Sequence, residues 1–157
     1  ARHIWSILCT KAIVDRETNS ISLFDSIESL ESNKEIVPPP ESGDSLIVVQ
    51  NINMQLVTLW TRSDYAKPET ALSRLTLVGP NGKKLRQPDN IIDLTASTRN
   101  RVIFGFNGLA FLGFGVYEFL IELQHGEKGS PRWRKVASIP LEWTLNKDAT
   151  DAPKPKE

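Results

Sequence analysis

Residues 115–145 constrain the fold most strongly, because this segment has the sequence pattern of a long antiparallel hairpin. Two runs rich in β-branched and aromatic residues flank a polar turn that contains two glycines. Pro140 marks the return run as an edge strand or a bulged one. Every second side chain of a strand shares a face, and the residues expected to point inward are Tyr117, Phe119, Ile121 and Leu123 in the first run and Ala137, Ile139, Leu141 and Trp143 in the return run.

The rest of the chain repeats this pattern of strands and turns. Turn residues recur about every ten residues, as in sandwiches and barrels, and no window has a clean helical apolar period. We therefore expect an all-β fold, an antiparallel β-sandwich of about eight strands that is C2-like or immunoglobulin-like. Residues 1–147 are expected to form this single domain. Residues 148–157 have no apolar anchor and are expected to be a disordered C-terminal tail.

The N-terminal part of the chain predicts a hairpin. The β-rich runs 3–14 and 20–30 are separated by a polar turn, so we expect them to pair. The second run ends in a segment rich in Ser and Glu, which is expected to be helical for a turn or two. Further along, residues 71–79 alternate, and Asn81-Gly82 after them predicts a type I′ turn, which requires positive φ at both central positions.

Three other stretches have less regular patterns. The run 46–62 is strongly β-prone, but its polar middle at 50–53 predicts a bulge or a bend. Residues 107–115 combine glycine with apolar side chains and predict a buried or partly buried connection. In residues 31–45, consecutive prolines predict an exposed loop or an interrupted edge strand, because proline has no backbone N–H to donate.

Composition excludes some classes of partner and indicates a compartment. The 157 residues contain 19 basic and 19 acidic side chains, so the chain has no net charge with which to attract nucleic acid or an anionic membrane. Its single cysteine, Cys9, cannot form an internal disulfide. No cationic segment followed by an apolar run opens the chain, and no apolar run is long enough to span a bilayer. The expected location is the cytoplasm.

One short motif raises the possibility of catalysis. Gly43-Asp44-Ser45-Leu46 resembles the signature of the GDSL esterases, in which the serine is the nucleophile and a late Asp-x-x-His supplies the base. The chain has Glu122 three residues before His125, so the expected partner sequence is missing. A serine hydrolase centred on Ser45 is therefore an alternative, and a turn leading into a strand is the favoured interpretation. We expect no enzyme.

Metal and cofactor sites are not expected. The only histidines, His3 and His125, are far apart in the sequence, whereas a zinc site needs three or four ligands. Gly113 and Gly115 resemble half of a dinucleotide fingerprint, but a strand follows them where that site requires a helix.

The best candidate recognition surface is a basic, aromatic segment. Basic residues around an aromatic ring can hold phosphates and stack on bases, although the same pattern arises on a solvated strand face, which we favour. The other tryptophans, Trp5, Trp60 and Trp143, are expected in the core or at its rim. A carbohydrate-binding protein would need at least one of them exposed. The segment consists of Lys128, Arg132, Trp133, Arg134 and Lys135.

Weak motifs spread along most of the chain carry a family resemblance. On these motifs the chain resembles a bacterial family of small, mostly β proteins, filed as a domain of unknown function. The resemblance implies a compact β protein with no assigned activity, and it transfers no catalytic or binding residue. The motifs are Leu8-Cys9, Val14-Asp15, Asn19, Ser22-Leu23-Phe24, Ile27, Gly115-Val116-Tyr117-Glu118-Phe119 and Ile139-Pro140-Leu141.

Taken together, these observations favour a non-enzymatic binding or assembly module that acts through a β-edge or clustered loops. The expected partner is another protein, and self-association into a homo-oligomer is a second possibility. The alternatives are a small-ligand or carbohydrate binder that uses exposed aromatic residues and, less favoured, the hydrolase centred on Ser45. No cofactor or membrane is expected, and the sequence carries no strong nucleic-acid signal. Weak nucleic-acid binding through Arg132, Trp133, Arg134 and Lys135 is a further alternative.

Overall fold

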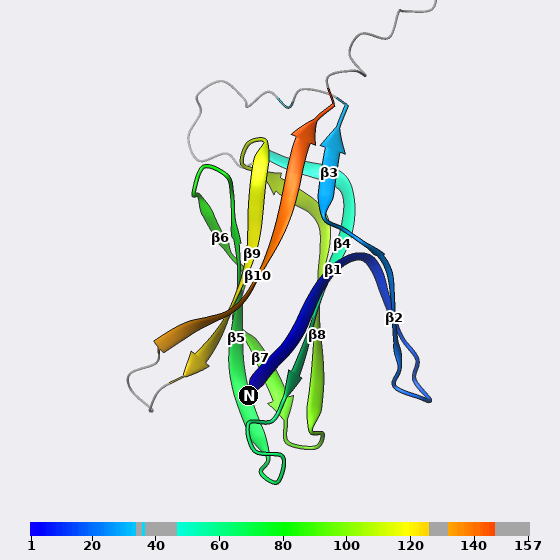
Figure 1. Ribbon diagram of the computed structural model, residues 1–157, viewed down its shortest axis with the longest axis vertical. Coiled ribbons are helices and arrows are strands. Elements are labelled where there is room, and N and C mark those ends of the chain that lie inside the picture. The colour runs from blue at the N-terminus through cyan, green and yellow to red at the C-terminus, as the bar shows by residue number, and fades with distance from the viewer. Residues whose placement is uncertain (34–35, 37–46, 126–131, 147–157) are drawn as a thin grey trace, which may run out of the picture.

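The computed structural model describes residues 1–33, 36, 47–125 and 132–146, and in these residues it is all-β. The described part contains ten strands arranged in two sheets, so the expected count of about eight was too low (Figure 1). The predicted tail at 148–157, the proline segment at 38–40 and Gly43-Asp44-Ser45-Leu46 lie outside the described residues.

The first sheet has four antiparallel strands. Their order is β2 (Ile21–Ser26), β1 (Arg2–Val14), β4 (Ile47–Thr61) and β8 (Arg99–Phe111). The expected N-terminal hairpin is confirmed, because β1 and β2 pair from Cys9↔Ser26 to Val14↔Ile21. The hairpin is joined by a polar turn in which the Asp15 carboxylate accepts the N–H groups of Glu17 and Thr18 at 2.9 and 2.7 Å.

The second sheet has six strands. The order is β3 (Ser29–Ser32), β10 (Arg132–Leu145), β9 (Gly115–His125), β5 (Glu69–Val78) and β6 (Lys84–Arg86), and β7 (Asn90–Leu94) pairs with the first half of β5. The predicted long hairpin is confirmed as β9 and β10.

The β3 strand corrects two expectations. The second half of the run 20–30 was expected to be helical, but it leaves the first sheet and joins β10 in the second. It runs parallel to β10, so among the described strands the pairing is not wholly antiparallel (Figure 1). Parallel strands need a crossover connection between them. The chain provides one here, because it passes through the first sheet between β3 and β10.

Both sheets contribute side chains to one hydrophobic core. The inward set predicted for β9 is confirmed, since Tyr117, Phe119, Ile121 and Leu123 are at most 4% exposed. Phe106 of the first sheet meets Phe119 of the second edge to face, with ring centroids 5.5 Å apart. Burying a side chain of this size stabilises a fold by about 1.5–3 kcal/mol. The opposed apolar faces therefore hold the sheets together.

The turn after β5 differs from the predicted type I′. Gly82 N–H donates to the Gly79 carbonyl at 2.9 Å and Gly79 N–H donates to the Lys83 carbonyl at 2.9 Å. Gly82 has φ of 79°, whereas Asn81 is not among the residues with positive φ. Pro80, the first central residue, cannot adopt the positive φ that a type I′ turn needs. The connection is consequently a type I turn followed by a glycine bulge.

The predicted bulge in β4 is confirmed, and it determines the shape of β8. The register moves from Val49↔Leu109 to Asn53↔Asn107, so three residues of β4 stand opposite Gly108. Gly108 has φ of 140°, and a Cβ there would lie 3.1 Å from the Val49 carbonyl oxygen. Residues 107–111 were expected in a connection, but they continue β8 because the bulge allows the two strands to pair again.

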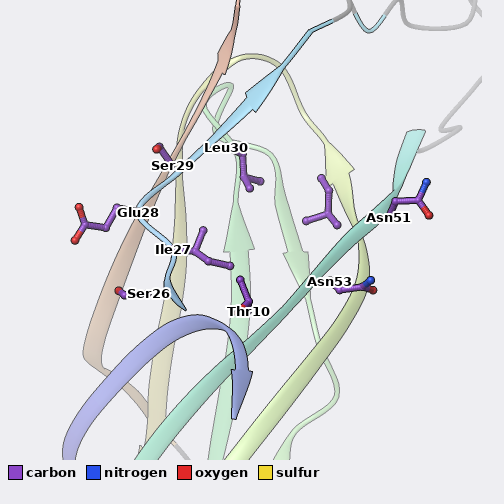
Figure 2. Close-up of a pocket in the computed structure, with 9 residues that line it drawn as sticks. Thr10, Ser26, Ile27, Glu28, Ser29, Leu30, Asn51 and Asn53 are labelled. Carbon is purple, nitrogen blue, oxygen red and sulfur yellow. The ribbon is translucent and has the colours of Figure 1, made fainter. Parts of the chain in front are cut away.

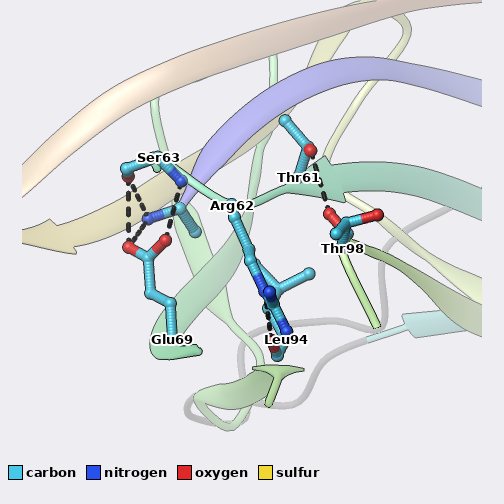
Figure 3. A network of polar contacts seen from close by, with 7 residues as sticks. Thr61, Arg62, Ser63, Glu69, Leu94 and Thr98 are labelled. Carbon is cyan, nitrogen blue, oxygen red and sulfur yellow. Dashed lines mark hydrogen bonds and ion pairs between the residues drawn. The ribbon is translucent and has the colours of Figure 1, made fainter. Parts of the chain in front are cut away.

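A buried arginine organises the end of the molecule near the start of β1. The Arg62 side chain is 9% exposed and donates to three backbone carbonyls, of Leu94 at 2.8 Å, Tyr65 at 3.0 Å and Thr95 at 2.9 Å. Beside it, Glu69 accepts hydrogen bonds from Ser63 and from the amino group of Ala1 (Figure 3). The planar guanidinium therefore ties the loop after β4 to the turn after β7.

Candidate functional site

The four described residues of the basic segment lie on β10 but do not share one face. Trp133 and Lys135 stand opposite Gln124 and Glu122 of β9, whereas Arg132 and Arg134 stand opposite His125 and Leu123. Directly opposed residues share a face of the sheet, and successive residues alternate. The candidate residues are therefore divided between the two faces, and Lys128 lies outside the described residues.

Trp133 is covered by an arginine from another strand. The Arg74 guanidinium carbon lies 3.6 Å from the centroid of the indole ring. Arg74 also donates from Nε and Nη2 to the two carboxylate oxygens of Asp89, at 2.9 and 3.3 Å. The hydrogen bond from Arg74 holds the pKa of Asp89 below its usual range. The indole face is thus occupied by a cation that is itself neutralised.

The remaining charges on this face also alternate in sign. Lys135 stands opposite Glu122, and Glu122 stands opposite Arg74. The Lys135 Nζ is 4.0 Å from Glu118 Oε2, which also accepts a hydrogen bond from Ser138 at 3.1 Å. Side chains of opposite charge that face one another on neighbouring strands are typical of a solvated strand face. Recognition through Arg132, Trp133, Arg134 and Lys135 stays a prediction.

Replacing Asp89 by asparagine should reduce the loss of stability in acid. Because the pKa of Asp89 is lowered from 3.8 in the folded state, its ionised form contributes stability above that value. The contribution is lost as pH falls below 3.8 through the folded-state pKa. We expect the urea midpoints at about pH 6 and about pH 2.5 to differ less for Asp89→Asn than for the unsubstituted protein. Equal differences for the two proteins would contradict the coupling.

The histidines and the cysteine do not form a site. His3 is half-buried, bonds to Ser6 Oγ at 2.6 Å and packs edge to face on Trp60, and burial lowers its pKa. His125 is exposed and contacts the Arg132 carbonyl at 2.9 Å. The Cys9 thiol is buried and donates to the Gln55 carbonyl. No group of three potential metal ligands occurs among the described residues.

A polar-rimmed pocket lies where the chain passes from β2 to β3. Its volume is about 550 Å³, and its walls come from residues 26–30, the β4 bulge and Thr10. Figure 2 shows Ile27 and Leu30 directed into the pocket, with Glu28 directed away from it. The acidic group that lines it therefore does not face its interior.

The strand β8 provides a candidate site that the sequence interpretation did not identify. It is the last strand of the first sheet, and in the described part of the chain no strand pairs with its other edge. The sequence signal was present, since residues 102–117 contain no charged side chain. Natural sheet edges usually carry charge, proline or a covering segment that prevents pairing with another chain. An uncharged edge of this length is suited to pairing.

An apolar groove lies beside this edge. It is a cavity of about 220 Å³ between the two sheets, on the side where β8 and β6 are the outermost strands. Gln87 is the one polar side chain among its lining residues. The groove is formed chiefly by Leu75, Leu77, Leu85, Phe106, Leu109 and Phe119.

Comparison of the chain with protein-family models, with curated proteins and with solved structures finds no match. Among the described residues there is no helix with the length and apolar character needed to cross a membrane.

Proposed function

We propose that the protein is a non-enzymatic binding module that accepts an extended strand of a partner protein on the free edge of β8. The observation that carries this proposal is a strand edge that is uncharged over residues 102–111 and has an apolar groove directly beside it. We also infer a cytoplasmic location and a sandwich of immunoglobulin-like or C2-like type. The shared core of the two sheets supports the sandwich.

Strand addition uses two kinds of contact. The outward-pointing N–H and C=O groups of β8 supply main-chain hydrogen bonds, which provide affinity. Side chains at every second position of the added strand would point between the sheets, where the groove receives them. Phe106 and Leu109 of β8 line that groove, so the two kinds of contact are adjacent.

The groove also defines the chemistry of the partner. Its lining is apolar except for Gln87, so a charged side chain placed there would lose its hydration without a counter-charge. The partner segment is therefore extended, uncharged and apolar at alternate positions. A second copy of this chain, pairing β8 with β8, is the alternative occupant, and the two can be distinguished by the oligomeric state.

The other functional candidates have less support. All four tryptophans lie in the described residues, and none is exposed, with Trp60 and Trp143 at most 1% exposed. A carbohydrate site built on an exposed indole therefore has no residue to carry it. Ser45 lies outside the described residues, so no geometry favours a hydrolase.

The substitution Gly105→Lys should block strand addition while leaving the fold intact. Gly105 is exposed on β8, has no positive φ, and a Cβ there would meet no atom within 4 Å. A lysine on an edge strand opposes pairing with another chain. With a synthetic peptide of about eight alternating valine and threonine residues, we expect slowed hydrogen exchange at alternate amides of residues 101–111. We expect this protection to be lost in Gly105→Lys.

Gly105→Ser is the matched control, since it adds a side chain without charge and should retain the protection. Sedimentation of the unsubstituted protein distinguishes the occupants, because a dimer that Gly105→Lys dissociates would assign the edge to a second copy. Absence of protection on β8, with a monomeric protein, would refute the proposal.

A further inference from the structure

A third cavity, on the outer face of the first sheet, has a different chemistry. Its volume is about 510 Å³, and it lies between the tip of the β1–β2 hairpin and the adjoining parts of β4 and β8. Val14, Leu59 and Ile103 provide its apolar lining. Arg99 and Arg101 also line it, together with hydroxyl and amide side chains of the hairpin tip and of residues 97–100. We call it the guanidinium pocket.

Arg101 is held in place by neutral acceptors. Its Nη1 donates to Asn19 Oδ1 at 2.8 Å and its Nη2 donates to the Asn19 carbonyl at 2.7 Å. Asn19 itself has φ of 54°, the left-handed conformation found in tight turns. The Nε–H of Arg101 is buried and makes no hydrogen bond. The guanidinium is therefore oriented by neutral acceptors and is not paired with a carboxylate.

Among the described residues that line the pocket, none is acidic. No carboxylate of the described residues forms an ion pair with Arg99 or Arg101 within 4.0 Å. The nearby Asp15 carboxylate is engaged by the N–H groups of its own turn. An unpaired arginine beside a cavity differs from Arg74 on the other sheet, which is neutralised by Asp89.

The charge of Arg99 also acts on Tyr65, which does not line the pocket. Its pKa is lowered first by a hydrogen bond with Thr61 and further by the charges of Arg2 and Arg99. The electrostatic effect of Arg99 therefore reaches beyond the pocket, although the chain as a whole has no net charge.

We propose that the guanidinium pocket binds an oxyanion carried on an apolar body. Arg99 would hold the oxyanion, because the planar guanidinium presents paired donors that match a carboxylate or a phosphate. Arg101, whose Nη atoms already donate to Asn19, would add its positive charge and its remaining Nη hydrogens. Val14, Leu59 and Ile103 would contact the apolar body. The volume lies within the range of about 300–1,000 Å³ that is typical of small-molecule sites. The pocket uses side chains on the outer face of β8, whereas strand addition uses the main-chain groups of the β8 edge and the groove between the sheets. Either proposal can therefore fail without the other.

Titration with small probes tests the proposal. Hexanoate carries both features, hexanol has only the apolar body, acetate has only the charge, and hexyl phosphate replaces the carboxylate. Two-dimensional NMR of the arginine Nε–Hε signals follows Arg101 directly. We expect hexanoate or hexyl phosphate to shift the Arg101 signal at a concentration about tenfold lower than acetate or hexanol requires. Whichever of hexanoate and hexyl phosphate binds at the lower concentration then identifies the preferred oxyanion, a carboxylate or a phosphate.

Variants locate the binding. Arg99→Gln leaves the Arg101–Asn19 hydrogen bonds in place and should weaken binding about tenfold, the effect of losing one charged hydrogen bond. Arg101→Gln, followed through the Arg99 Nε–Hε signal, should weaken binding at least as much, and Arg134→Gln on the other sheet should change nothing. The proposal would be overturned if acetate shifted the arginine signal at the same concentration as hexanoate. It would also be overturned if hexanoate bound both Arg99→Gln and Arg101→Gln as well as it binds the unsubstituted protein. The absence of any shift would overturn it too.

Discussion

The substitution Trp143→Ala is expected to lower the free energy of unfolding by about 3–5 kcal/mol, the cost of removing a fully buried aromatic side chain. Trp143 is 1% exposed and packs on Phe111 edge to face and on Tyr117, with ring centroids 5.2 and 5.7 Å away. Its indole N–H donates to Ser32 Oγ at 2.9 Å. The side chain thus joins β10 to β3 and to the end of β8. Urea unfolding followed by circular dichroism measures the loss.

Trp133→Ala on the same strand is the matched control. That indole is only partly buried and contacts Arg74 at the surface, so we expect a cost of about 1 kcal/mol or less. Trp143→Phe should fall between the two, because it keeps a ring against Phe111 and loses the bond to Ser32. Similar losses for Trp143→Ala and Trp133→Ala would mean that the core contact at β3 contributes little.

The substitution Arg62→Met is expected to cost about 2–4 kcal/mol, since hydrogen bonds to a charged group contribute about 1.5–3 kcal/mol and their effects overlap. Methionine retains most of the aliphatic volume but leaves the carbonyls of Leu94, Tyr65 and Thr95 without their donor. We further expect faster hydrogen exchange in residues 62–66 and 94–98, because the guanidinium links these two loops (Figure 3).

The substitution Arg62→Lys tests whether stability depends on the positive charge at this position or on the planar shape of the guanidinium. A lysine keeps the positive charge, but its compact ammonium cannot reach three divergent carbonyls in one plane. We therefore expect a stability between those of the unsubstituted protein and Arg62→Met. Arg134→Met, at an exposed position of β10, should cost less than about 0.5 kcal/mol. Full stability of Arg62→Lys would show that the fork geometry is not required.

The candidate sites show what residue patterns can and cannot reveal. The uncharged run at 102–117 was visible in the sequence, but its meaning depends on β8 being the last strand of its sheet. Conversely, the basic segment around Trp133 was conspicuous in the sequence. In the structure Lys135 pairs with Glu118, and the ring of Trp133 is covered by Arg74, both from other strands.

The pairing of Arg101 with Asn19 was not predictable from either segment. The two residues are 82 positions apart. In the sequence, each is an ordinary polar residue at a turn or at the end of a strand. Only the folding of the hairpin tip over β4 and β8 makes a pocket between them. A local sequence pattern does not predict a contact between two residues so far apart, because the chain segment between them can close in many ways.

The sequence by itself determined the all-β class, several of the strands and the buried face of β9. The alternation in β9 identified its buried set, the polar turn after β1 identified a hairpin, and the stretch at 50–53 identified a bulge. These features follow from the two-residue period of a strand and from local turn chemistry. Only the tertiary structure decided which strands are neighbours. Placing β3 beside β10, and leaving β8 at an edge, depends on contacts between residues as far apart as Ser32 and Trp143, and their energies are absent from any short segment.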